Sequence, residues 1–324
     1  MLFNILSFLP LFLYIHSEIC ASYYKCLDSS LARNDDICQI KYTDEKDLTT
    51  FAVRPCKEGY KCNAVANTPF SYCQKIFAPY PLGNKCVHDK ECVSSICTEG
   101  KCVSKALNET CASYLDCPYN SYCDKKCLGV KNAGDNCTSN DQCPFGYLCG
   151  HSSNVTSAQK KCLMMYTLQR GEYSTDAKLC ESGKVSGGRC YDTYRASEDG
   201  PIKCKINDEC VKVTLFGDKN GTENSECNCT LLGENYCDYT TMSDEWKEFV
   251  KVAKKEIENN KDKEMYVPPT RNSPFLLNEK ILKAYRKTLV INYNADDCII
   301  NSLSSDNINI SMLLLLLFAI VVYM

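Results

Sequence analysis

The sequence predicts small disulfide-rich modules in tandem, loop-rich with short β-hairpins, followed by a C-terminal α-helical hairpin. Three observations predict this fold class: 26 cysteines in 324 residues, a cysteine pattern that recurs between Cys86 and Cys162, and two amphipathic stretches after Cys237. Units of about 25 residues bury too little apolar surface to offset their conformational entropy, so they need disulfides that contribute about 2–4 kcal/mol each. Cysteine is therefore expected to take the place of a large core.

The recurring pattern opens with two cysteines that are separated by five residues, and two further cysteines follow. Proline and aromatic residues between the second and third cysteines suit tight turns. The segment from Cys56 to Cys62 resembles this part of the repeat, so we expect an older copy formed by Cys38, Cys56, Cys62 and Cys73, which gives about four units. The cysteines of the three regular copies, all expected in disulfides, are Cys86, Cys92, Cys97, Cys102, Cys111, Cys117, Cys123, Cys127, Cys137, Cys143, Cys149 and Cys162.

The N-terminus carries an apolar run that indicates a signal peptide over residues 1–17. Cleavage after Ser17 keeps Cys20, whereas cleavage after Ala21 removes it. Cys20 and Cys26 show the same five-residue separation as the repeats, and keeping both leaves an even number of cysteines. We therefore expect cleavage after Ser17 and paired thiols in an oxidising compartment.

The C-terminus predicts a lipid anchor. Its final apolar run, 312–324, is shorter than the roughly 20 residues of a membrane-spanning helix, and no basic residue follows it. Small residues and a polar spacer precede this run, so residues 301–324 fit a GPI-anchor signal with Ser302 as the anchored residue. The alternative is a single-pass helix that begins near Ile308.

The rest of the chain divides by cysteine density. Residues 18–77 form an irregular cysteine-rich module, residues 78–162 the three tandem repeats, and residues 163–240 a looser cysteine-rich region. In this last region, alternating residues over 209–216 followed by a glycine-containing turn predict a strand and a turn, which a second strand could extend to a hairpin.

Residues 241–300 predict the helical hairpin. Positions 246, 249, 250, 253 and 257 form an apolar stripe at helical spacing after the N-cap candidate Ser243, and 278–289 repeats such a stripe. One-sided helices of this length must bury their stripes, either on each other or on the cysteine-rich part. If they run antiparallel, Cys298 comes close to Cys237 or Cys229, and we predict a disulfide that closes the hairpin.

Catalytic groups are scarce. The three histidines are His16, in the signal segment, and His88 and His151, in cysteine modules. There is no Gly-x-Ser-x-Gly, phosphate loop or dinucleotide fingerprint. Zinc sites favour Cys-x2–4-Cys knuckles in pairs, and the recurrent separation here is five. We expect no catalytic, cofactor-binding or metal-binding residues, and so no enzyme. The net charge of −3 without a basic block argues against nucleic-acid binding.

Glycosylation acceptors of the form Asn-x-Ser/Thr occur five times, two of them with a central cysteine. In a chain with a signal peptide they indicate surface exposure of the array and of the turn after residue 216. The acceptor residues are Asn108, Asn136, Asn154, Asn220 and Asn228.

The pattern Gly83-x-x-Cys86-x5-Cys92-x4-Cys97-x-x-Gly100-x-Cys102 resembles the cysteine modules of the Dickkopf N-terminal or EB type. The whole plan of signal peptide, cysteine repeats, helical region and anchor tail resembles the cysteine-rich GPI-anchored surface proteins of ciliated protozoa. Those proteins are rich in Cys-x-x-Cys, which this chain lacks. The resemblance implies an extracellular display or recognition role and no set of catalytic residues.

Together these observations predict a cell-surface protein on the extracellular face of the plasma membrane, GPI-anchored or single-pass. Its role would be binding or coat formation, its partner an unknown extracellular protein or glycan, with the membrane contacted through the C-terminal anchor and no nucleic acid. Alternatives are a protease inhibitor, a single-pass structural protein, and an enzyme in residues 163–297, which would need a pocket with converging titratable groups. Four module aromatics either contact a partner or pack on the disulfides: Tyr119, Tyr122, Phe145 and Tyr147.

Overall fold

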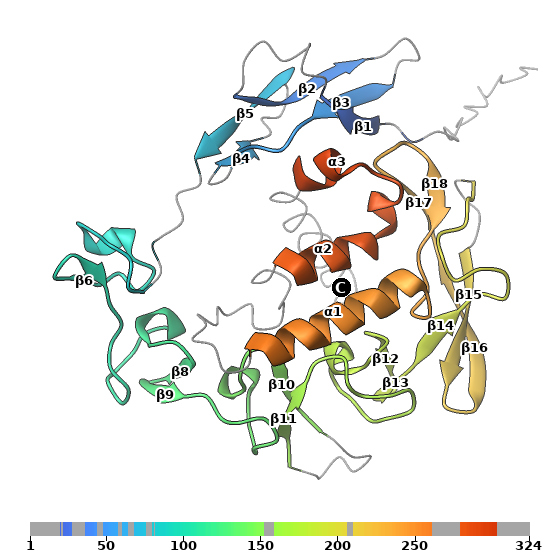
Figure 1. Cartoon of the computed structure of the whole chain (residues 1–324). Helices are drawn as coiled ribbons and strands as arrows, with labels where there is room; N and C mark the ends of the chain where they lie inside the picture. The colour runs from blue at the N-terminus through green and yellow to red at the C-terminus, as the bar shows by residue number, and fades with distance from the viewer. Residues whose placement is uncertain are drawn as a thin grey trace, which may run out of the picture.

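Figure 1 shows the computed structural model of the chain, which describes residues 20, 22–27, 36–43, 48–57, 60–63, 68–75, 80, 82–151, 159–205, 210–260 and 279–302. The predicted signal peptide, the apolar tail after Ser302 and the acceptor Asn154 lie outside these residues. All 26 cysteines lie within them and form 13 disulfides. Short hairpins and loops predominate and the helices lie near the C-terminus, which confirms the predicted fold class.

The N-terminal module is a five-stranded sheet that contains the disulfide pattern of the repeat. Its strand order is β1-β3-β2-β5-β4, with β1 parallel to β3 and the other neighbours antiparallel. The disulfides Cys38–Cys62 and Cys56–Cys73 join first to third and second to fourth cysteine, as in the repeats, but on longer strands. The strands are β1 (Ser22–Cys26), β2 (Ile37–Thr43), β3 (Thr49–Val53), β4 (Tyr60–Asn63) and β5 (Phe70–Lys75).

The three regular repeats have one design: a turn of 3-10 helix, then a short hairpin, held by two crossing disulfides. We call residues 83–102, 108–127 and 134–162 modules 1, 2 and 3. Each joins its first cysteine to the third and its second to the fourth: Cys86–Cys97 and Cys92–Cys102, Cys111–Cys123 and Cys117–Cys127, Cys137–Cys149 and Cys143–Cys162. The hairpins are β6 (Cys97–Thr98) with β7 (Lys101–Cys102), β8 (Ser121–Asp124) with β9 (Lys126–Gly129), and β10 (Tyr147–Gly150) with β11 (Lys161–Met164).

A fourth copy follows at residues 171–190, module 4, within the region that the sequence predicted to be looser. It has the same turn of 3-10 helix, and its hairpin is β12 (Val185–Ser186) with β13 (Arg189–Cys190). Gly171 N–H donates to the Cys190 carbonyl at 2.9 Å, as Gly83 does to Cys102 at 2.8 Å in module 1. Only one disulfide remains, Cys180–Cys190, because the first and third cysteine positions hold Ser174 and Val185. The predicted boundary after Cys162 thus separates two copies of one repeat.

Beyond module 4 the chain forms two further antiparallel sheets. The predicted strand and turn are part of a hairpin, β15 (Cys210–Phe216) with β16 (Lys219–Ser225), and β14 (Asp192–Tyr194) adds a third strand beside β15. A second small sheet consists of β17 (Cys227–Cys229) and β18 (Asn235–Cys237). Two disulfides, Cys204–Cys227 and Cys210–Cys237, join this region.

The helical region contains α1 (Asp244–Asn260), α2 (Glu279–Lys287) and α3 (Asp297–Ser302). The Ser243 hydroxyl accepts a hydrogen bond from Trp246 N–H at 3.2 Å, which makes it the N-cap of α1. Lys280 Nζ lies 3.2 Å from Glu256 Oε1, and the Tyr285 ring lies 5.4 Å from Phe249. Residues later in α2 therefore contact residues earlier in α1, so the two helices run antiparallel.

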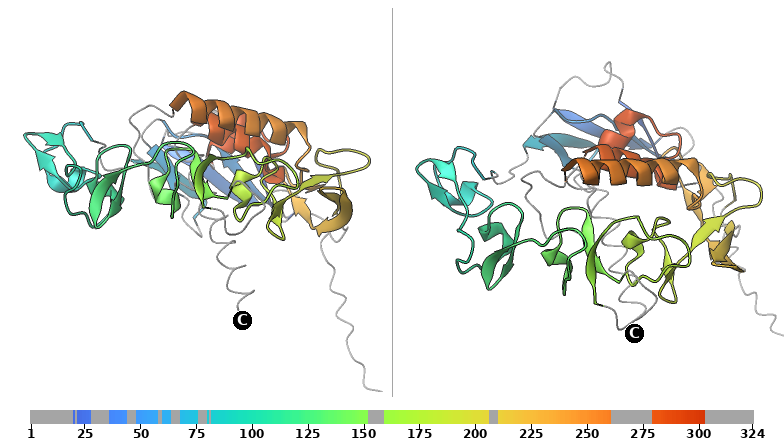
Figure 2. Two further views of the ribbon diagram at one scale, coloured as in Figure 1. Left: turned by 90° about the horizontal axis from the view of Figure 1, so that it is seen from below. Right: turned by 60° about the horizontal axis from the view of Figure 1, so that its bottom comes forward.

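The apolar stripe of α1 covers modules 3 and 4 (Figures 1 and 2). Its buried residues Phe249, Val250, Ala253 and Ile257 share one core with module residues such as Phe145, Leu148, Leu179 and Cys180. Gly146 and Gly183 allow this close approach, since a Cβ atom on either would stand 2.5 Å from Ile257 or Trp246. No described helix covers modules 1 and 2, and the buried clusters of these two modules consist of cysteines alone.

The two ends of the described chain are joined by disulfides across the molecule. Cys20 pairs with Cys229 and Cys26 with Cys298, which brings β1 against β17 and α3. The predicted partner of Cys298 was therefore wrong: Cys237 is bonded to Cys210 and Cys229 to Cys20. The end of the helical hairpin does lie beside the β17–β18 sheet, since Leu231 N–H donates to the Ile291 carbonyl at 2.8 Å. The cysteine that bonds to Cys298 nevertheless comes from β1. Among the described residues, no helix has both the length and the apolar character to cross a membrane.

Candidate functional site

A cleft of about 520 Å³ lies where module 4, the β14–β16 sheet and the helical hairpin meet. Module 4 contributes Lys184, β15 and β16 contribute Lys212 and Glu223, and the helices contribute Trp246 and Tyr285. Its volume falls in the range of roughly 300–1,000 Å³ that is usual for sites of small organic ligands. Titratable and aromatic side chains from distant parts of the sequence thus converge in one cavity.

Lys212 occupies the interior of this cleft. The strand alternation of β15 turns it to the same side as Cys210 and Thr214, so the side chain is only 3% exposed. Its ammonium donates one hydrogen bond, to the Tyr239 carbonyl at 3.0 Å. Burial lowers the pKa of Lys212 to about 8, with Lys184 and Arg195 adding to this effect and Asp238 and Glu223 opposing it.

The carboxylates beside Lys212 have other partners. Glu223 Oε1 lies 2.5 Å from Lys184 Nζ, and its other oxygen accepts a hydrogen bond from the Tyr191 hydroxyl at 3.1 Å. Burial works to raise the pKa of Glu223, but the Lys184 ammonium and the Tyr191 hydroxyl hold it below the ordinary value. Burial and this carboxylate in turn raise the pKa of Tyr191 to about 12. Asp238 accepts a hydrogen bond from the Asn228 amide at 3.2 Å.

The sequence analysis did not find this cleft. Its only local signal was a lysine at an inward-facing position of a predicted strand, between Cys210 and Thr214. The rest of the site depends on tertiary contacts between module 4, two strands and two helices, which no spacing pattern encodes. Such a pocket is what the enzyme alternative for residues 163–297 required, and its carboxylates Glu223 and Asp238 accept hydrogen bonds from Lys184, Tyr191 and Asn228.

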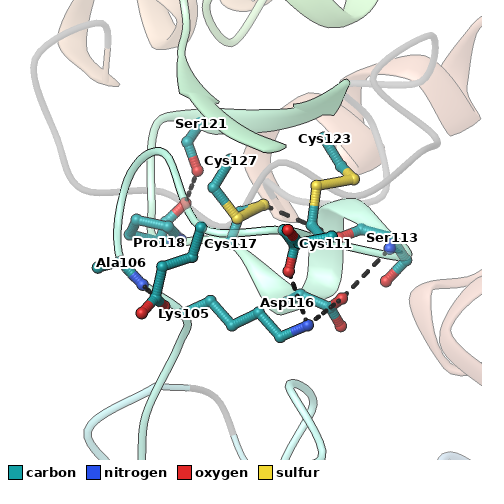
Figure 3. The surroundings of a disulfide bond; sticks show 12 residues. Lys105, Ala106, Cys111, Ser113, Asp116, Cys117, Pro118, Ser121, Cys123 and Cys127 are labelled. Atoms are coloured by element: carbon teal, nitrogen blue, oxygen red, sulfur yellow. Dashed lines mark hydrogen bonds and ion pairs between the residues drawn. A yellow bond between two sulfur atoms is a disulfide. The ribbon is translucent and has the colours of Figure 1, made fainter. Parts of the chain in front are cut away.

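The predicted disulfide residues lie in the modules, and Figure 3 shows those of module 2. Cys111–Cys123 and Cys117–Cys127 cross behind the 3-10 turn, whose Asp116 carboxylate accepts hydrogen bonds from Ala112 and Ser113 N–H. Lys105, in the joint before the module, pairs with Asp116 at 3.4 Å. The disulfides close the module while polar side chains cap its turn, so this part of the chain is a scaffold.

The predicted module aromatics mostly pack inside. Tyr122 is 8% and Phe145 4% exposed, and Phe145 belongs to the core under α1. Tyr147 is half-buried against the same core, and the Tyr119 hydroxyl donates to the Leu82 carbonyl of the joint before module 1 at 3.4 Å. The interpretation of these residues as partner contacts is therefore wrong for Tyr122 and Phe145, and the packing alternative holds.

The glycosylation acceptors differ in accessibility. Asn108, Asn136 and Asn220 are exposed, on modules 2 and 3 and on the hairpin of β15 and β16. Asn228 is half-buried between two disulfide-bonded cysteines, and its amide nitrogen bonds to Glu226 and Asp238. Exposure suits a glycan at the first three positions, whereas the hydrogen bonds of Asn228 compete with modification.

The cysteine sulfurs of the described modules are all bonded to one another. Several groups of three sulfur atoms lie within 4.8 Å of one another in the described residues, for example those of Cys111, Cys117 and Cys127. Each of these sulfurs is part of a disulfide, so none is a thiolate that could coordinate zinc. His88 is exposed, and His151 lies edge-on to Tyr173.

Comparison with known proteins gives little beyond this. No family model and no solved structure matches the chain. An uncharacterized protein of Dictyostelium discoideum is 36% identical over 74 residues, which cover 21% of each chain, so this chain spans about one fifth of that relative. Thirteen disulfides that use every cysteine are the mark of a cysteine-rich, extracellular-type protein, and on this basis the chain is assigned to that broad class.

Proposed function

We propose that this protein is a non-catalytic binding or coat protein of the cell surface, held at the extracellular face of the plasma membrane by a lipid on Ser302. The observation that carries the proposal is the position of Ser302 at the end of α3, which the Cys26–Cys298 disulfide ties to β1. Both ends of the mature chain would then leave the fold at one side. The module array lies apart from α3 and would be displayed to the outside (Figure 1).

The disulfides and the exposed glycosylation acceptors of modules 1 to 3 also support the display role. Modules 1 and 2 hold themselves closed with two disulfides each and need no helix above them. Exposed acceptors at Asn108 and Asn136 would place glycans along modules 2 and 3. The partner would be an extracellular protein or a glycan, recognised by the exposed surface of the array rather than by Tyr122 or Phe145.

The anchor is tested by release from intact cells. The full chain, tagged at the exposed turn after Gly217, is expressed in cells that attach GPI anchors and treated with a phosphatidylinositol-specific phospholipase C. We expect release of most surface protein, and secretion without phospholipase when residues 303–324 are deleted. A control in which a spanning helix with a basic flank replaces these residues stays on the cell. Retention of the wild-type protein, as in this control, would overturn the anchor and favour a single-pass protein.

A further inference from the structure

We propose that the cleft at Lys212 binds a small organic anion, a carboxylate carried on a flat apolar body such as an aromatic ring. This site is separate from modules 1 to 3 and does not depend on the anchor. Inside the cleft the protein leaves hydrogen-bonding capacity unused at Lys212.

The Lys212 ammonium has three N–H donors, and one of them donates a hydrogen bond to the Tyr239 carbonyl. Among the described residues no carboxylate comes within ion-pair distance, and the side chain is 3% exposed. A buried charge without an ion pair is costly, so proteins rarely retain one without a partner. An anion in the cleft would accept the remaining hydrogen bonds.

Most other donors of the cleft already have partners in the protein. Four of the lining hydroxyl groups donate to backbone carbonyls: Thr288 to Tyr285 at 2.7 Å, Thr241 to Thr193 at 3.3 Å, Ser225 to Cys210 at 3.3 Å and Ser182 to Lys184 at 3.4 Å. Thr240 donates to an Asp199 carboxylate oxygen at 2.9 Å, and Lys184 is paired with Glu223 at 2.5 Å. Lys212 is the charged donor that remains, and its charge selects an acceptor with negative charge.

The wall of the cleft on the side of the helices is apolar and aromatic. Trp246, Tyr285 and Leu289 line the side of the cleft formed by the helices, together with Ile291. The Trp246 ring is held in place because its N–H donates to the Glu181 carbonyl at 3.0 Å. Apolar and aromatic walls favour a flat apolar body, while Lys212 fixes the charged end.

Trp246 is the only tryptophan of the chain. It lines the cleft and also a neighbouring hollow beside Lys247 and Lys254, so its fluorescence reports binding in either place and the Lys212 variant below distinguishes them. The probe is 4-bromophenylacetate, whose bromine quenches indole emission by contact, and the matched control is the uncharged 4-bromophenylacetamide. We expect saturable quenching of the native full chain by the acid, at concentrations at least tenfold below those that the amide needs. Equal quenching by both compounds, or none by either at millimolar concentration, would overturn the proposal without any variant.

Two variants locate the charge. Lys212→Met keeps the length of the side chain and removes its ammonium, so the acid should lose at least tenfold in affinity and approach the amide. Lys203→Met removes an exposed lysine that pairs with Glu234 outside the cleft, and its affinity should equal that of the wild type. Undiminished quenching of Lys212→Met by the acid would exclude Lys212 as the recognition group.

Discussion

In module 1 the first and third cysteines form a disulfide, Cys86–Cys97, whereas the same places in module 4 hold Ser174 and Val185. The backbones nevertheless agree: Cys86 N–H donates to the Gly100 carbonyl at 3.0 Å, and Ser174 N–H to Gly188 at 2.9 Å. What differs is the surroundings. The buried hydrophobic cluster of module 1 consists of cysteines, while module 4 lies under α1.

A second pair of corresponding residues shows how packing under a helix takes the place of a disulfide. Glu91 ends the 3-10 turn of module 1, and its carboxylate accepts hydrogen bonds from Val87 and His88 N–H. The corresponding residue of module 4 is Leu179, which is fully buried in the core under α1. Asp176 caps the turn instead, since its carboxylate accepts from Lys178 N–H at 2.9 Å. A helix that covers a small module can thus replace one of its two disulfides.

The largest effect is expected from removing the helix cover. Phe249→Ala deletes a fully buried ring between α1 and the modules and should lower the free energy of unfolding by about 3–5 kcal/mol. Amide hydrogen exchange should accelerate in module 4 and remain unchanged in module 1. Val87→Ala, at a residue that is 78% exposed in module 1, is the control and should change little. Equal acceleration in both modules would break the comparison.

The second largest effect is expected from exchanging the residues at the first and third cysteine positions between modules 1 and 4. Cys86→Ser with Cys97→Val gives module 1 the residues of module 4 without its helix, and should cost about 2–4 kcal/mol. Urea unfolding, with exchange in module 1 as the local measure, tests this. The reverse pair, Ser174→Cys with Val185→Cys, should form a disulfide that mass spectrometry of non-reduced peptides detects. A module 1 that keeps its protection without Cys86–Cys97 would contradict the account.

The buried ammonium of Lys212 in the cleft beside module 4 should lower the stability of the protein. Burial lowers the pKa of Lys212 from 10.5 to about 8, and Lys184, Arg195, Asp238 and Glu223 are the charged groups around it. Between these values the unfolded chain holds a proton that the native chain has lost, so stability should rise with pH there, by up to about 3 kcal/mol. Lys212→Met should abolish this rise and be the more stable protein at pH 7. Urea unfolding from pH 7 to 10 measures it, and a rise that persists in Lys212→Met would refute it.

The smallest effect concerns the caps of the 3-10 turns. Hydrogen bonds from Val87 and His88 N–H lower the pKa of Glu91, so this cap is complete above pH 4.5 and is lost as the pH falls through the lowered value. The amide NMR shifts of Val87 and His88 should titrate with a midpoint below 4.5, and Glu91→Gln should abolish the titration. A midpoint at or above 4.5 would show that the cap contributes nothing.

Local patterns predicted much of this fold. The five-residue cysteine separation identified modules 1 to 3, and the stripe of α1 with its cap Ser243 was correct almost to the residue. Module 4 escaped notice because the repeat was recognised by its cysteines, two of which are absent. The positions of Gly171, Gly183 and Gly188 were the remaining signal. They repeat positive-φ positions of module 1, which a search on backbone requirements would have found.

The long-range features could not be predicted. Cys298 was expected to pair with Cys237 or Cys229, but its partner Cys26 comes from the far end of the sequence. Spacing carries no information about a contact between segments so distant. The cleft at Lys212 has the same origin, because module 4, strands β15 to β17 and the helical region all contribute to its walls.

The central claim is that α1 does in module 4 what Cys86–Cys97 does in module 1. Its most direct test is hydrogen exchange at the Ser174 and Cys190 amides in Phe249→Ala, with and without the disulfide introduced by Ser174→Cys and Val185→Cys. We expect that the disulfide restores most of the protection that Phe249→Ala removes, while it adds little to the protein with an intact α1. Protection that stays low in Phe249→Ala with the disulfide, or that never depends on Phe249, would contradict the claim.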